Sequence, residues 1–194
     1  MTEGEERRLV RRLKQRDEEA FREVVTLYQH KVLNLVFRLL GDYEEAQDLS
    51  QEVFVAVFKH IDAFRGDARF STWLYRIATN LCMNRLKYHK RRARDRTQSL
   101  TEGPEGDGGM LPLVSNSPTP EKLMAGHQLE VAVQKALANL SEEYRTLIVL
   151  RDTEHMAYAD IATITGLNEG TVKSRLHRAR AALKIEVNRY YETD

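Results

Sequence analysis

The chain contains few cysteines, prolines and glycines, and these absences exclude several classes of protein. Its 194 residues include one cysteine, Cys82, which excludes a disulfide framework and a zinc site built from several thiolates. All four prolines and five of the ten glycines lie between residues 103 and 126, whereas a β-sandwich would scatter them through its turns. No apolar run approaches the roughly 20 residues that span a bilayer, and the N-terminus lacks a signal-peptide core. We therefore expect a helical, cytoplasmic protein.

The sequence also lacks a recognisable catalytic or metal-binding cluster. Its six histidines never occur in a metal-ligand spacing such as HExxH. Asp62, Asp67 and Asp95 are too isolated to form the carboxylate cluster of a metal-dependent nuclease. We expect no metal, no cofactor, no small-molecule substrate and no enzymatic activity.

The net charge of +1 hides two strongly basic segments. Residues 85–96 carry seven basic side chains and one acidic one, and residues 171–184 carry five basic side chains and no acidic one. Two separate basic segments of this kind indicate two contacts with a polyanion. Solvated helix faces are the alternative interpretation of each.

Hydrophobic spacing predicts an all-α protein made of two small helical domains joined by a flexible linker. The first domain, residues 1–95, is expected to contain helices over 18–40, from Asp42 and from Ser71 to about Arg92. Residues 96–120 are acidic, rich in glycine and proline and without a period, which is typical of a linker. The second domain, residues 121–194, is helical again.

The second domain contains the pattern of a helix-turn-helix. Ala162 is small where the two helices would cross, Gly166 suits a turn that requires a positive φ, and Asn168 can cap the second helix. That second helix would present donors for base edges and cations for phosphates in a DNA groove. A helical hairpin with a basic exterior is the structural alternative. The side chains expected to bind DNA are Thr171, Lys173, Ser174, Arg175, His177, Arg178 and Arg180.

In the first domain, aromatic residues alternate with arginines just before and within the third expected helix. Aromatic rings stack on unpaired bases while cations follow the phosphate chain. Asn80 and Asn84 are one helical turn apart and could both reach bases, whereas Trp73 could equally belong to the core. The candidate single-strand site comprises Phe64, Arg65, Arg69, Phe70, Trp73, Tyr75, Arg76, Asn80, Asn84 and Lys87.

A small acidic patch lies on the second expected helix, away from its apolar stripe. It comprises Asp48, Gln51 and Glu52, with Val55 as an apolar edge. By itself, this pattern is typical of an ordinary solvated face.

Two segments give these features a common context. Residues 44–86 (EEAQDLSQEVFVAVFKHIDAFRGDARFSTWLYRIATNLCMNRL) and 166–183 (GLNEGTVKSRLHRARAAL) resemble the two characteristic portions of extracytoplasmic-function sigma factors, a compact group of the bacterial sigma-70 family. The resemblance extends to both domains and their order. It departs from the family at Ala157, where a capping serine is frequent, and at Asn168–Glu169, where Pro-Val is frequent.

The resemblance implies a function for each group of residues. The first domain (sigma region 2) would bind the β′ clamp helices of RNA polymerase through the acidic patch and would melt the −10 promoter element. The residues from Phe64 to Phe70 would capture a flipped base, and Tyr75, Arg76, Asn80 and Asn84 would line its pocket. The second domain (sigma region 4) would read the −35 duplex and dock on the β flap. An anti-sigma factor is the expected regulator.

Two other classes remain as alternatives. A two-domain helix-turn-helix regulator that acts without polymerase would need a ligand pocket or a phosphoacceptor aspartate, and the first domain has no strands for a receiver fold. An enzyme acting on nucleic acid would need the carboxylate or metal cluster that the sequence lacks.

Overall fold

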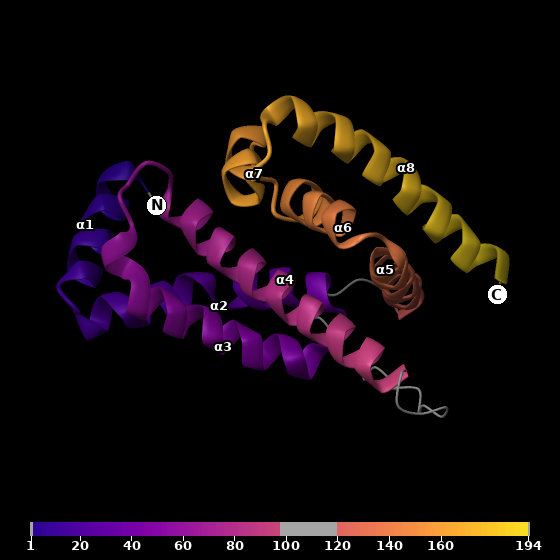
Figure 1. Cartoon of the computed structure of the whole chain (residues 1–194), viewed down its shortest axis with the longest axis horizontal. Coiled ribbons are helices and arrows are strands. Elements are labelled where there is room, and N and C mark those ends of the chain that lie inside the picture. The colour runs from indigo at the N-terminus through magenta and orange to yellow at the C-terminus, as the bar shows by residue number, and fades with distance from the viewer. Residues whose placement is uncertain (1, 98–119, 194) are drawn as a thin grey trace.

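The computed structural model of the chain describes residues 2–97 and 120–193, and throughout these ranges the regular structure is helical (Figure 1). The expected all-α class with two helical domains is confirmed. The expected linker, 96–120, lies mostly outside the described residues. None of the described helices combines the length and apolar character that crossing a bilayer requires. The first domain comprises α1 (Glu3–Lys14), α2 (Glu18–Leu40), α3 (Tyr43–His60), the 3₁₀ turn η1 (Ile61–Ala63) and α4 (Phe70–Thr97). The second comprises α5 (Pro120–Asn139), α6 (Glu142–Ile148), the π-helical turn η2 (Val149–Thr153), α7 (Tyr158–Thr165) and α8 (Glu169–Thr193).

The boundary between α2 and α3 follows directly from local sequence. The Asp17 carboxylate accepts hydrogen bonds from the backbone N–H groups at the start of α2, as expected for an N-cap. Gly41 ends α2 with a φ of 87° and donates its N–H to the Phe37 carbonyl. Asp42 then accepts from the Glu45 N–H at 2.8 Å and starts α3.

Helix α1 was not among the helices expected from the sequence. Its start is a reciprocal capping box between Thr2 and Glu5, and its buried side chains are Leu9 and Leu13. The T-x-x-E pattern before an apolar spacing of four residues is the signal that could have identified it.

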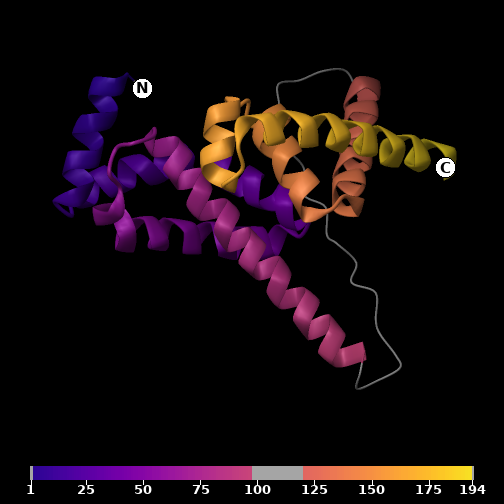
Figure 2. The ribbon, with the colours of Figure 1, turned by 45° about the horizontal axis from the view of Figure 1, so that its top comes forward.

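The start of α4 also differs from expectation. Ser71 was expected to be the N-cap, but it lies inside the first turn because α4 begins at Phe70. The Phe70 N–H donates instead to the carboxylate of Glu6, which comes from α1. Helix α4 continues to Thr97, beyond the expected end near Arg92. Its C-terminal part projects away from the rest of the molecule (Figure 2).

The two domains pack against each other. Their buried apolar side chains form one hydrophobic cluster that runs from Leu9 in α1 to Ala179 in α8. Between the domains, α4 packs on α7, and α2 packs on α5, α6 and η2. The buried Arg145 guanidinium of α6 donates to carbonyls at the end of α5 and to the Leu39 carbonyl at the end of α2, the last at 2.6 Å.

The helix-turn-helix has the expected turn. Gly166 ends α7 with a φ of 72°, and the Asn168 side chain accepts from the Thr171 N–H at 2.8 Å near the start of α8. Ala157, before α7, provides no side-chain cap. Between η2 and α7, His155 has a φ of 53°, in the left-handed region that favours glycine.

We predict that the left-handed backbone at His155 destabilises the fold. A His155→Gly chain should have a free energy of unfolding about 1 kcal/mol higher than a His155→Ala chain, because alanine carries the Cβ that this conformation disfavours. Urea denaturation of both variants measures the difference. The control is Ala159→Gly on the exposed, helical surface of α7, where glycine should destabilise. Equal midpoints for the two His155 variants would show that the conformation carries no strain.

Candidate nucleic-acid interface

Helix α8 presents an exposed polar and basic face next to the helix-turn-helix turn. Lys173, Ser174, His177 and Arg178 are all exposed. The Lys173 ammonium lies 5.3 Å from the centroid of the Tyr158 ring, a cation–π contact with α7. The expected donors therefore share one solvent-facing surface.

The two arginines expected to flank this face are already paired. Arg175 is partly buried and forms an ion pair with Glu143. Arg180 donates to the Asp152 carboxylate, with its Nε 3.0 Å from Oδ2, and the pKa of Arg180 is raised mainly by this hydrogen bond. Thr171 is partly buried at the start of the helix. These three residues brace α8 against its own domain.

In the first domain, the structure corrects the assignment of the aromatic residues. Phe70 is fully buried and Phe64 is only 6% exposed, so neither offers a free face for stacking in this arrangement. Trp73, which the sequence indicated as a possible core residue, is the partly exposed member of the cluster. Its ring centroid lies 5.4 Å from that of Phe64 and 5.8 Å from that of Phe70. The two phenylalanines support the loop from beneath.

Tyr75 was expected on the outer face of α4, but the second domain covers it. Its side chain is 6% exposed, and its hydroxyl donates to Glu154 at 2.8 Å. Burial is the main cause that raises the pKa of Tyr75, followed by the nearby Glu154 carboxylate, so the phenol stays protonated. One turn earlier, the Thr72 hydroxyl donates to Asp160 of α7 at 2.9 Å.

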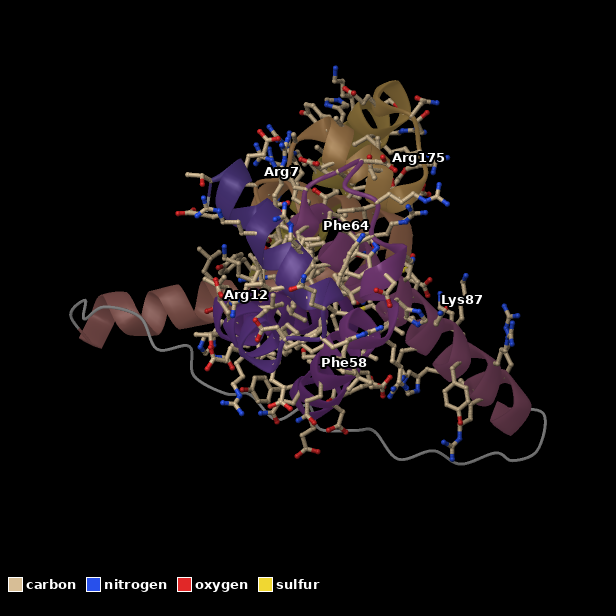
Figure 3. All side chains as sticks on the ribbon, turned by 90° about the vertical axis from the view of Figure 1, so that its left-hand side faces the viewer. Arg7, Arg12, Phe58, Phe64, Lys87 and Arg175 are labelled. Atoms are coloured by element: carbon tan, nitrogen blue, oxygen red, sulfur yellow. The ribbon has the colours of Figure 1, made fainter. Side chains whose placement is uncertain are left out.

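The remaining polar candidates of the first domain stay exposed along α4 and the loop before it. They are Arg65, Arg69, Arg76, Asn80, Asn84 and Lys87. Figure 3 shows Lys87 well separated from Phe64, so the candidate residues extend along the helix rather than meeting at one point.

A cleft of about 1300 Å³ adjoins the Phe64–Phe70 loop. The loop forms one wall, α1 forms another through Glu6, Val10 and Lys14, and the segment from Glu154 to Thr163 lies across from them. Its lining mixes cations and carboxylates. Among the described residues, no group of three or more histidine, cysteine, aspartate or glutamate side chains could hold a metal ion.

The acidic patch on α3 is exposed as a unit. Asp48, Gln51 and Glu52 face solvent, and Glu52 also pairs with Arg85 of α4 at 2.8 Å. Val55 is 51% exposed and extends the patch with an apolar surface.

Sequence reasoning missed Phe58, which is 47% exposed one turn beyond Val55. Its ring contacts Phe21, with centroids 4.6 Å apart, and the Arg16 guanidinium lies 5.2 Å from its centroid. The i, i+3 spacing of Val55 and Phe58, off the buried stripe, is the signal that could have found it.

Comparison with known proteins gives this arrangement a family. Residues 24–92 match the model of sigma-70 region 2, and residues 130–183 match that of sigma-70 region 4. The chain is 40% identical over 185 residues to RNA polymerase sigma-H factor of Pseudomonas aeruginosa, covering 94% of each chain. It is 38% identical over 180 residues to ECF RNA polymerase sigma-E factor of Escherichia coli, covering 92% of each.

Solved structures agree on the fold. The sigma factor RpoE of Bartonella quintana, solved with the anti-sigma factor NepR, superposes with a TM-score of 0.68 at 24% identity, covering 87% of this chain and 96% of that one. CnrH, solved with the cytosolic domain of CnrY, gives a TM-score of 0.66 at 22% identity, covering 94% of this chain and 97% of that one. Two matched regions in the same order, together with relatives of nearly equal length, lead to one conclusion: the chain belongs to the extracytoplasmic-function (ECF) RNA polymerase sigma factors of the sigma-70 family.

Proposed function

We propose that residues 1–95 bind core RNA polymerase and melt the −10 element, and that residues 121–194 read the −35 element. The observation that carries this proposal is that each matched region exposes its own polar surface, the first on α3 and α4 and the second on α8. The chain would act in the cytoplasm, as a subunit that directs the polymerase and catalyses no reaction itself. Transcription by core polymerase with and without the purified chain, on a promoter library, is the direct test. A regulator that acts without polymerase would leave the products unchanged.

At the −35 element, α8 would lie in the major groove. Arginine and lysine donate to guanine edges, and the N-terminal turns of a recognition helix are those nearest the bases. Arg178 is exposed and carries five donors in a planar fork, which suits base recognition. Arg180 would have to give up part of its pairing with Asp152 to hold a phosphate.

We predict that Arg178→Ala weakens −35 duplex binding by about 1–3 kcal/mol and relaxes sequence preference at one base pair. The matched control is Arg180→Ala, which removes the same charge two residues away. It should cost less and affect all sequences evenly, because this guanidinium is already engaged. Fluorescence anisotropy with a duplex selected from a random library measures both variants. An unchanged preference in Arg178→Ala would exclude this residue from base readout.

The exposed surface of α3 is our proposed contact with the clamp helices of the β′ subunit. Asp48 and Glu52 lie one helical turn apart and can meet one basic surface, while Val55 and Phe58 add apolar area beside them. The interaction would combine charge complementarity, which speeds encounter, with apolar burial. The β flap and an anti-sigma factor are further partners that the family resemblance implies.

At the −10 element, Asn80 and Asn84 are our candidates for base contacts. Bases become available on their pairing edges only when they leave the duplex, and an asparagine side chain offers both a donor and an acceptor to such an edge. Arg65, Arg69 and Arg76 are exposed nearby along the chain and would hold phosphates.

We predict that Asn80→Ala leaves the fold and −35 duplex binding unchanged but impairs promoter opening. The holoenzyme should bind a single-stranded −10 oligonucleotide more weakly and with less sequence preference if Asn80 reads a base. Rescue on a template whose −10 bases are mismatched would instead assign the residue to melting. Normal opening together with normal oligonucleotide preference would contradict both roles.

The packed arrangement of the two domains would have to open before promoter binding. The −10 and −35 elements are roughly 25 base pairs apart, about 85 Å of duplex at ~3.4 Å per base pair. In the structure α4 contacts α7 directly, and Glu154 covers Tyr75. We propose that the second domain leaves α4 when the holoenzyme engages a promoter.

We predict that a disulfide between Thr72→Cys and Asp160→Cys blocks initiation. The two native side chains are in hydrogen-bond contact, and the only native cysteine, Cys82, is buried, which raises its pKa to about 12 and keeps it unreactive. Oxidised protein should lose run-off transcription at least tenfold (roughly 1.4 kcal/mol or more), and a reductant should restore it. Each single-cysteine variant is the control. Full activity of the oxidised pair would show that opening is unnecessary.

A further inference from the structure

Helix α1 contacts the backbone at both ends of the Phe64–Phe70 loop. The Lys14 ammonium donates to the Phe64 carbonyl at 2.7 Å, and a Glu6 carboxylate oxygen accepts from the Phe70 N–H. These pairs join residues 50 and 64 positions apart in the chain. The helix that makes them lies outside the segment matched to region 2, residues 24–92.

Each contact satisfies a backbone group that the loop leaves without a helical partner. The first N–H groups of a helix have no acceptor within it, and a carboxylate also interacts favourably with the positive end of the helix dipole. Glu6 therefore serves the start of α4 in place of a local cap. Lys14 serves the other end of the loop, at the carbonyl that follows η1.

The helix that holds these two side chains is itself fixed to the core. Leu9 and Leu13 of α1 are buried in the hydrophobic cluster, and Arg16, just after the helix, donates to the Phe58 carbonyl and to Asp62. Between the two anchors, Arg65, Gly66, Asp67 and Arg69 remain exposed. The loop is thus held at its ends and open at its centre.

We propose that α1 is the positioning element of the single-strand site, with Glu6 and Lys14 as positioning residues that set the shape of the Phe64–Phe70 loop. This inference rests on the proposed −10 function of that loop. Neither side chain needs to contact DNA, because each acts through a backbone group of the loop. The precision of base capture then depends on a helix that precedes the matched region.

The test compares Lys14→Ala and Glu6→Ala with the wild type, each assembled with core polymerase. The probe is a single-stranded oligonucleotide selected by the wild-type holoenzyme from a random library, alongside a scrambled oligonucleotide. Each variant should bind the selected oligonucleotide about three- to tenfold more weakly, the range for loss of one hydrogen bond, with a lower ratio of selected to scrambled affinity. Affinity for the −35 duplex should not change.

Three controls separate positioning from other effects. Arg11→Ala removes the same charge from an exposed position on α1 and should leave the ratio unchanged. Lys14→Arg retains a donor and should restore it. A thermal melt of each chain verifies that binding is measured on folded protein, and Lys14→Ala provides the test if Glu6→Ala does not fold, because Lys14 does not serve the start of a helix.

The outcomes distinguish this inference from the proposed function. If the wild-type holoenzyme selects no single-stranded sequence, the −10 function of the loop is wrong. If the wild type selects a sequence and both alanine variants keep the same selected-to-scrambled ratio, the positioning role of α1 alone is overturned.

Discussion

One buried guanidinium holds together the chain segments on which the packed arrangement depends. Arg145 donates from Nε to the Leu137 carbonyl at 2.8 Å, and from its terminal nitrogens to the carbonyls of Ala138 and Leu39 at 2.6 Å. These acceptors lie at the C-terminal ends of α5 and α2, where helices leave carbonyls unpaired and favour a cation. Burial lowers the pKa of Arg145, and the planar fork of donors compensates for that loss of solvation. Lysine could not reach several carbonyls at once.

Elements defined by neighbouring residues could be predicted from the sequence. Asp17 and Asp42 act as N-caps, and Gly41 and Gly166 have the positive φ that their helix ends require. The exposed face of α8 and the acidic patch of α3 also follow, because helical periodicity alone decides which side chains are off the apolar stripe. The family resemblance, carried by contiguous motifs, belongs to the same local information.

Features defined by partners far apart in the chain could not be predicted. The cap of α4 comes from Glu6 rather than Ser71, and no periodicity reports a bond between such distant positions. The burial of Tyr75 depends on Glu154 of the other domain. Phe64 and Phe70 show the same limit, since alternating aromatic and basic residues fit both a stacking surface and a core, and only packing decides between them.

The π-helical turn η2 has a consequence for how this gene segment can vary. The Glu154 N–H donates to the Val149 carbonyl five residues back, so this turn contains one more residue than an α-helical turn would. Deleting one residue between Val149 and Thr153 would rotate everything that follows by about 100°. Glu154 and the start of α7 would then face away from α4. Among descendants of this sequence, substitutions in the turn should accumulate much more readily than single-codon insertions or deletions, although it lies beside a surface loop where length changes are usually tolerated.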